Sequence, residues 1–167
     1  MPNIPNDEQH AGHATTGLGH STHDDGRLRL SLNQEITELE RLAEEVESFA
    51  AGQGWPSALI MQINLVLEEI IVNTMNYGYP DGRVGNIELT MEVDPDEIRI
   101  QIEDDANPYD PFTEAPAPDL SAGLEDRPIG GLGVYLVQSY MDICMYQRAP
   151  GRNLISLVKR LPAHLPS

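Results

Sequence analysis

The sequence predicts an α/β (α+β) two-layer sandwich, with helices on one face of a mixed, mostly antiparallel sheet. Segments of strand and helix periodicity follow one another as strand, helix, helix, strand, strand, a long irregular segment, helix, strand and strand. Strands joined by short turns form antiparallel hairpins, and the helices then pack as a second layer. With 167 residues, 40% of them hydrophobic, the chain is long enough for one domain with its own core.

Residues 1–26 are predicted to be a disordered tail. They are rich in Gly, Thr, Ser, Asn, Asp and His and lack apolar periodicity. Four of the five histidines lie here, and a metal-binding tract is one interpretation of them, although no cysteine supports it and a solvated tail is favoured. These four are His10, His13, His20 and His23.

The folded domain is predicted to span residues 27–161, followed by a short C-terminal tail over 162–167. Residues 27–32 alternate polar and apolar, as a strand does. A helix follows from about residue 35, with Asn33 as a candidate N-cap and Gly52 and Gly54 at its end. A second helix starts after Pro56 and runs to about Tyr77. It is apolar nearly all round, which predicts a buried helix.

The second half of the domain begins with a predicted hairpin, with strands over 86–93 and 98–104. A segment with five prolines then covers about 105–129. Irregular segments of this length in a compact domain are usually functional lids or disordered. A helix over 130–141 and two strands over 143–148 and 153–160 complete the domain.

Composition excludes several classes of protein. The net charge of −17 disfavours direct contact with DNA or RNA and suits a basic protein partner, unless the charge serves solubility alone. The sequence has no long uncharged apolar stretch, so it predicts no membrane span. No secretory signal is expected at the N-terminus either. The single cysteine, Cys144, fits a core position and excludes an internal disulfide. A cytoplasmic protein fits these features.

Two polar residues interrupt the apolar second helix. Glu69 and Asn73 are four residues apart, so their side chains share one helical face. Such breaks in a pattern are candidate functional sites. An amide oxygen on a rigid helix suits Mg²⁺, which often takes one or two protein ligands and fills its octahedron with water and phosphate. A carboxylate one turn earlier could accept a proton from an attacking hydroxyl. Glu68 is either a solvent-facing neighbour or a second acid.

Two later features could complete a nucleotide site. Asp104 ends a strand, where it could accept a hydrogen bond from an adenine amino group or merely cap the loop. The run Gly130-Gly131-Leu132-Gly133 opens a helix, and such N–H groups attract phosphate. The chain has no Gly-x-x-x-x-Gly-Lys-Ser/Thr run, so a P-loop is excluded. It also lacks the strand-lysine and His-Arg-Asp pattern of eukaryotic-type protein kinases.

As an ordered set, these motifs resemble the GHKL ATPase superfamily and its Bergerat fold. The likeness is greatest to anti-sigma-factor serine kinases of the RsbW/SpoIIAB type. It covers about residues 27–161, and its specific stretches are 67–73, 104–111 and 130–137, with further matches at 141–142 and 151–161.

The resemblance implies roles and partners. Glu69 matches the catalytic glutamate, Asn73 the Mg²⁺ ligand and Asp104 the acid that reads adenine. The run from Gly130 to Gly133, which includes Leu132, matches the phosphate-binding segment at the end of an ATP lid. The resemblance also implies ATP and Mg²⁺ as cofactors, a sigma factor and a STAS-domain anti-anti-sigma protein as partners, and a homodimer.

Ala106 departs from the family pattern, because a glycine usually follows the adenine-reading acid at this position. A methyl group could restrict the backbone or crowd the adenine. Two functions therefore remain open: an ATP-dependent serine kinase, and a nucleotide-gated or nucleotide-free module that binds its partner without phosphoryl transfer. A sensor histidine kinase is disfavoured, since none of the five histidines lies in a predicted helix.

Overall fold

We describe the protein from a computed structural model, in which residues 19–115, 121 and 132–163 are described. One six-stranded sheet organises them, in the order β1-β2-β3-β4-β6-β5, and every neighbouring pair is antiparallel. The strands are β1 (Ser21–Asp24), β2 (Arg27–Leu32), β3 (Ile87–Val93), β4 (Glu97–Asp104), β5 (Ile143–Ala149) and β6 (Arg152–Arg160).

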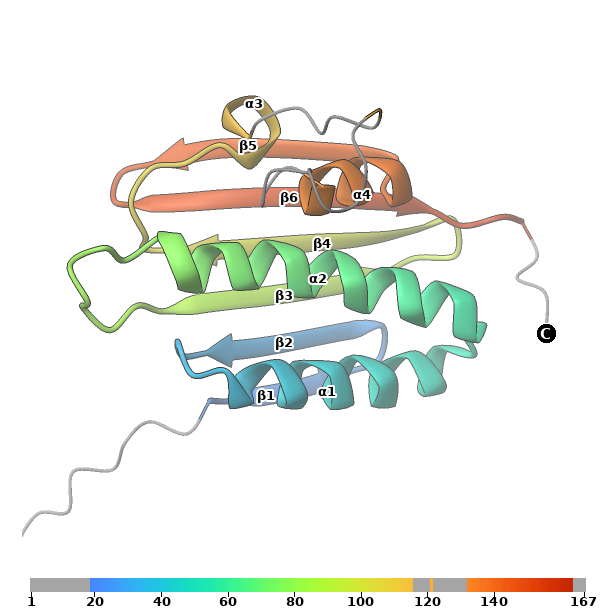
Figure 1. The fold of residues 1–167 in the computed structure, drawn as a ribbon. Coiled ribbons are helices and arrows are strands. Elements are labelled where there is room, and N and C mark those ends of the chain that lie inside the picture. The colour runs from blue at the N-terminus through green and yellow to red at the C-terminus, as the bar shows by residue number, and fades with distance from the viewer. Residues whose placement is uncertain (1–18, 116–120, 122–131, 164–167) are drawn as a thin grey trace, which may run out of the picture.

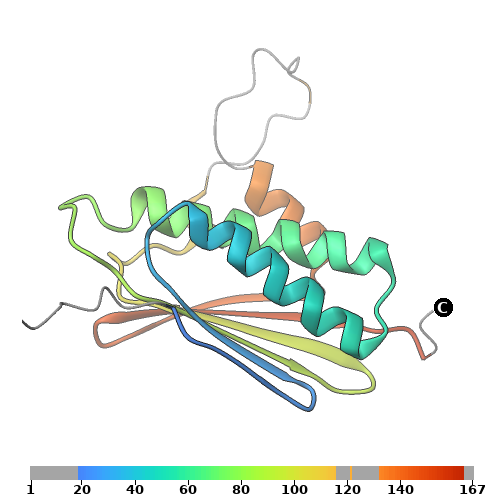
Figure 2. The ribbon, with the colours of Figure 1, turned by 90° about the horizontal axis from the view of Figure 1, so that it is seen from below.

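The helices of the described residues lie on one face of this sheet. Figure 1 shows α1 (Thr37–Gln53) in front of β1 and β2, α2 (Ser57–Tyr77) along the centre and α4 (Leu132–Tyr140) near β6. The short helix α3 (Pro111–Glu114) lies near β5. Figure 2 shows the two layers from below, with the helices together on one side of the twisted sheet. The predicted two-layer α/β sandwich is thus confirmed, and its described strand pairs are all antiparallel.

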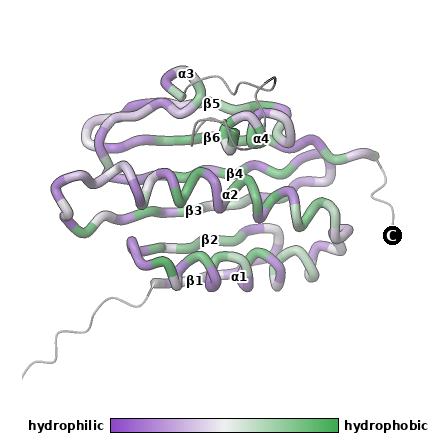
Figure 3. The backbone as a smooth tube through the Cα atoms, in the orientation of Figure 1, coloured by the Kyte–Doolittle hydropathy of each residue, from purple (hydrophilic) through white to green (hydrophobic). Residues whose placement is uncertain are grey.

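The core lies between the two layers because the strands alternate. On each inner strand, every second residue points to the helices and is buried. Figure 3 shows that hydrophobic and hydrophilic residues also alternate along the helices. Each fully buried Leu or Ile contributes about 1.5–3 kcal/mol of burial free energy. The buried strand residues are Leu28, Leu30, Leu32, Ile87, Leu89, Met91, Ile98, Ile100, Ile102, Ile155 and Leu157.

Helix α2 is the central element of the helical layer. It contacts both α1 and α4, and six of its residues are buried. By length and composition alone it would also pass as a membrane-spanning helix, a test that the core helices of soluble proteins pass too. Its packing on the sheet explains its apolar character without a membrane. The prediction of a buried second helix is therefore confirmed for the face that packs on the sheet, whereas Met61, on another face, is 62% exposed.

The folded region begins earlier than the sequence predicts. Residues 21–24 were expected to belong to the tail, but they form β1, an edge strand that pairs with β2 from Ser21↔Leu30 to Asp24↔Arg27. Gly26, with φ 75°, allows the turn between them. The residues Ser-Thr-His-Asp are polar throughout, so periodicity gives no signal for this strand. His10 and His13 lie outside the described residues.

The start of α1 also differs from the prediction. Asn33 does not cap the helix: its side chain accepts a hydrogen bond from the backbone N–H of Glu35 at 3.0 Å, which makes a local turn. The helix begins at Thr37, and the preceding residue, Ile36, makes no side-chain capping bond. At the other end Gly54 adopts a left-handed conformation, with φ 69°, as the sequence predicts for a helix-ending glycine.

Two glycines at the end of α1 should respond oppositely to alanine. Gly52 lies inside the helix, and a methyl group there would meet no atom within 4 Å, so Gly52→Ala should raise the free energy of unfolding by about 0.5 kcal/mol. Gly54 has a positive φ, so Gly54→Ala should lower it by about 1 kcal/mol. Urea unfolding of both variants measures the two shifts. Shifts of the same sign would contradict the assigned helix end.

Candidate functional site

A cavity of about 400 Å³ lies between α2, the end of β4, the segment after it, α4 and β6. Three of the residues singled out from the sequence share its wall: Asn73, Asp104 and Ala106. The rest of the lining is mostly apolar, as in sites that hold an aromatic base. It consists of Ile70, Thr74, Tyr77, Gly78, Asn107, Pro108, Tyr109, Pro111, Ala115, Val134, Asn153 and Ile155.

Glu69 lies one helical turn before Asn73 and faces the start of α4. A methyl group added to Gly133 would collide with the Glu69 carboxylate oxygen Oε2, so this carboxylate lies directly over the Gly133 backbone. Burial, and to a lesser extent the charge of Glu68, raise the pKa of the Glu69 carboxyl above its ordinary value. The structure thus brings together a glutamate and a glycine that are 64 positions apart in the chain.

Asp104 is a buried carboxylate at the end of β4, only 3% exposed. One of its oxygens, Oδ1, accepts hydrogen bonds from the backbone N–H of Ala106 at 3.0 Å and from the side-chain amide of Asn153 at 2.7 Å. Burial raises the pKa of the Asp104 carboxyl, and these two hydrogen bonds counteract part of that rise. Such a carboxylate at a cavity wall favours a ligand that donates a hydrogen bond.

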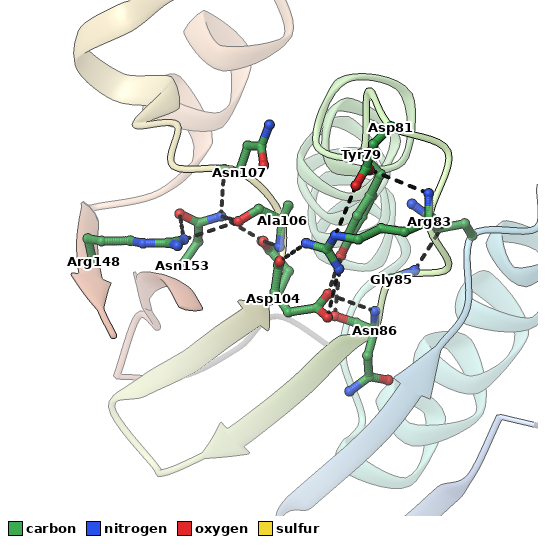
Figure 4. Close-up of polar contacts among 12 residues, drawn as sticks. Tyr79, Asp81, Arg83, Gly85, Asn86, Asp104, Ala106, Asn107, Arg148 and Asn153 are labelled. Atoms are coloured by element: carbon green, nitrogen blue, oxygen red, sulfur yellow. Dashed lines mark hydrogen bonds and ion pairs between the residues drawn. The ribbon is translucent and has the colours of Figure 1, made fainter. Parts of the chain in front are cut away.

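Asn153 is a part of the site that the sequence analysis missed. It pairs with Asp104 across the β4–β6 ladder and is also 3% exposed. Its side-chain oxygen accepts a hydrogen bond from the hydroxyl of Tyr146 at 2.7 Å. It also accepts one from Arg148 at 2.9 Å (Figure 4). The signal in the sequence was an asparagine at an inward-facing position of a strand that is otherwise apolar on that side.

Ala106 stands where the family pattern has glycine, and the structure shows how it fits. The residues described with positive φ are all glycines, so the Ala106 backbone needs no glycine. Its methyl group lies against Gly78, where an added Cβ would come within 2.6 Å of it. The backbone N–H of Asn107 also donates to the Gly78 carbonyl at 3.0 Å. Ala106 and Gly78 thus form a close-packed pair in the cavity wall.

A second polar cluster supports this wall from the outside. Asp105 accepts hydrogen bonds from the Tyr79 hydroxyl at 2.8 Å, the Asn86 backbone at 3.0 Å and Arg83 at 3.0 Å (Figure 4). Burial acts to raise the pKa of the Asp105 carboxyl, but these hydrogen bonds and the Arg83 charge hold it below its ordinary value. The cluster fastens the loop over 79–86 to the end of β4.

The glycine run is only partly within the described residues. Gly130 and Gly131 lie outside them. Leu132 begins α4, is 40% exposed and is not among the described residues that line the cavity. Gly133 is the member of the run that the structure places, against Glu69.

The donor groups are compatible with Mg²⁺ held by few protein ligands. Within residues 19–115, 121 and 132–163, no three His, Cys, Asp or Glu side chains are grouped to hold a metal. Asn73 contributes an amide oxygen at the cavity wall, and the Glu69 carboxylate lies one turn away. This sparse set of oxygens fits a cation that takes most of its ligands from phosphate and water.

Comparison with known proteins places the chain in a family. Residues 32–159 match the model of the histidine kinase-like ATPase domain. The serine/threonine-protein kinase BtrW of Bordetella bronchiseptica is 30% identical over 112 residues, which cover 67% of this chain and 78% of that protein. The serine-protein kinase RsbW of Staphylococcus epidermidis is 28% identical over 145 residues, covering 83% and 88%.

A solved structure shares the fold. The RsbU and RsbW domains of Rv1364c from Mycobacterium tuberculosis align with a TM-score of 0.56 and 13% identity, over 84% of this chain and 34% of that one. The present chain therefore spans about a third of that longer protein. The family match and the fold agree with the resemblance to GHKL ATPases seen in the motifs. The chain belongs to the histidine kinase-like ATPase domain family.

Proposed function

We propose that this protein is an ATP-dependent serine/threonine-protein kinase and anti-sigma factor. In this proposal it phosphorylates a STAS-domain antagonist and sequesters a sigma factor. The observation that carries the proposal is one arrangement. Asp104 is buried at the wall of a cavity that Asn73 of α2 also lines, and Glu69 lies one turn before Asn73 on α2. An adenine reader, a metal ligand and a base would then lie along one path.

The adenine would bind at the Asp104 end of the cavity. Asp104 Oδ1 already accepts two N–H groups, and its second oxygen receives no hydrogen bond from the described residues. An ionised carboxylate only accepts hydrogen bonds, so it suits the 6-amino group of adenine. The apolar walls, which include Ile70, Val134 and Ile155, would contact the faces of the base.

The phosphates would lie toward α4, near Asn73 and Gly133. Asn73 would hold Mg²⁺, which when bound neutralises charge on the phosphate oxygens. Glu69 would accept the proton of a serine or threonine hydroxyl on the substrate while the oxygen of that hydroxyl attacks the γ-phosphorus. The bond from that phosphorus to the bridging oxygen of ADP breaks, and the products are a phosphorylated side chain and ADP. The raised pKa of Glu69 brings it nearer to what a base needs at neutral pH.

The partners are proposed from the relatives and from charge. BtrW and RsbW are named as serine or serine/threonine kinases, which supports a protein substrate. The net charge of −17 suits basic surfaces on a partner and disfavours nucleic acid. We also propose that the protein is cytoplasmic and forms a homodimer.

The alternative is a partner-binding module without kinase activity. Ala106 is the observation that favours it, because its methyl group lies at the cavity wall. Against it, the methyl packs on Gly78 and the Ala106 backbone has an ordinary negative φ. This geometry supports a nucleotide-binding site with alanine at this position.

Phosphoryl transfer can be tested directly. The protein should transfer one phosphoryl group from Mg-ATP to a STAS-domain protein, detected as a mass gain by mass spectrometry. Glu69→Ala should bind ATP with similar affinity but transfer about 10²–10⁴-fold more slowly, because it lacks the base. Glu68→Ala, which removes the exposed neighbouring carboxylate and only the lesser cause of the raised Glu69 pKa, is the matched control and should transfer far faster than Glu69→Ala. Wild-type-like transfer by Glu69→Ala would refute its role, and absent ATP binding by the wild type would favour the alternative.

Gly133→Ala should impair transfer through Glu69. The added methyl collides with the Glu69 carboxylate and must displace it. A displacement of about 1 Å can slow a reaction about 100-fold. The double variant Glu69→Ala/Gly133→Ala should then transfer no more slowly than Glu69→Ala alone. The control variant Gly52→Ala should transfer at the wild-type rate. Additive losses in the double variant would contradict the link to Glu69.

Asp104→Asn should separate stability from binding. Burial raises the pKa of Asp104 in the folded state, so the ionised carboxylate lowers stability at neutral pH. The variant should therefore unfold at a higher temperature than the wild type at neutral pH. This gain should shrink as the pH falls through the raised pKa of the folded state and vanish below the ordinary value of 3.8, where the wild-type carboxyl is protonated in both states.

The same variant should bind ATP about tenfold to a hundredfold more weakly, because one charge-assisted hydrogen bond is lost. Calorimetry measures the affinity, and thermal unfolding across pH measures the stability. A variant that is destabilised at neutral pH, or that keeps full ATP affinity, would contradict this account of Asp104.

A further inference from the structure

We propose that Asn153 is a positioning residue that orients the Asp104 carboxylate for a 6-amino purine and thereby sets discrimination against 6-oxo purines. This inference rests on the proposed function and extends it to a residue outside the motifs. Asn153 acts through Asp104, to which its amide donates at 2.7 Å.

All the polar atoms of the Asn153 side chain are engaged by the protein. Its amide nitrogen donates to Asp104 Oδ1 and, at 3.1 Å, to the backbone carbonyl of Asn107. Its oxygen accepts from the Tyr146 hydroxyl and from Arg148. The two donors fix which end of the amide carries the oxygen, so the N–H groups must face Asp104. A side chain so fully used has no group left for a ligand, and its role is to hold others.

The consequence for Asp104 is that its two oxygens differ. Oδ1 is held by the Ala106 N–H and by Asn153, whereas no described residue donates to Oδ2. With the carboxylate ionised, the free oxygen can only accept a hydrogen bond. Adenine presents a 6-amino donor there, and a 6-oxo purine presents an acceptor, which leaves two acceptors facing each other.

The groups around Asp104 show that Asn153 also favours its ionised form. Asp105 and burial oppose the charge, and Arg148, which donates to the Ala106 carbonyl at 3.1 Å, supports it. Tyr79 lies on the far side, with its hydroxyl on Asp105. The hydrogen bond from Asn153 heads the interactions that lower the Asp104 pKa. Without it, Asp104 would take up a proton at higher pH and could donate to a 6-oxo group.

The experiment compares binding of ATP and inosine triphosphate by calorimetry across pH, without any protein substrate. Asn153→Ala should weaken the binding of ATP about tenfold to a hundredfold. It should weaken the binding of inosine triphosphate less. Its ATP affinity should also decline at a higher pH than that of the wild type as the solution is acidified. Ser156→Ala, on the same strand and the opposite face, is the matched control and should match the wild type.

Asn153→Asp keeps the size of the side chain and should reverse the pH trend. Its carboxyl would face Asp104 at the amide position, so the two would share one proton, which replaces the amide N–H at low pH. ATP affinity should then fall as the pH rises. This variant carries the test if Asn153→Ala does not fold.

The outcomes separate two failures. If the wild type binds neither nucleotide, the proposed function fails and this inference fails with it. If the wild type prefers ATP but the Asn153 variants weaken both nucleotides equally, with unshifted pH profiles, Asn153 serves the fold alone and only this inference is overturned.

Discussion

The buried hydrogen bond between Asn153 and Asp104 links the fold to the site. The two residues are direct partners in the β4–β6 ladder, and both are 3% exposed. At this point β4 ends, the segment toward α3 begins, and β5 contributes Arg148. A buried charge without partners would be strongly unfavourable. The wall of the cavity therefore depends on a small polar network to which β4, the segment after it, β5 and β6 all contribute.

The second constraint is that helices cover only one face of the sheet. Because α2 packs on the sheet and also contacts α1 and α4, it must be apolar around most of its circumference. Asn73 lies where α2 borders the cavity, so its amide is not packed against another apolar element. The same packing brings α4 close enough for Gly133 to meet Glu69. The apolar character of α2 and the position of the site thus have one physical origin.

Sequence patterns predicted the elements better than the contacts between them. The long helices and the inner strands followed from periodicity and from turn residues such as Gly54, but α1 begins later than predicted and α3 lies in a segment predicted to be irregular. Strand β1 was missed because its four polar residues gain their conformation from pairing with β2, which no local pattern reveals. Asn153 was missed for a related reason: its importance lies in contacts with Asp104, 49 positions away. Likewise, the fit of Ala106 depends on Gly78, a pairing visible only in three dimensions.

Environment assigns different chemistry to the two carboxylates of the site. Asp104 is held by two N–H donors and aided by Arg148, which counteract part of the rise in its pKa that burial causes. Glu69 receives no hydrogen bond from the described residues. Both burial and the charge of Glu68 raise its pKa, so its carboxylate binds a proton more readily than an ordinary glutamate does. A carboxylate held by fixed donors is suited to recognition, whereas one left free of donors is suited to accepting a proton. In the proposed function, recognition by Asp104 on β4 and proton transfer by Glu69 on α2 would thus be separated by the donors that each carboxylate has or lacks.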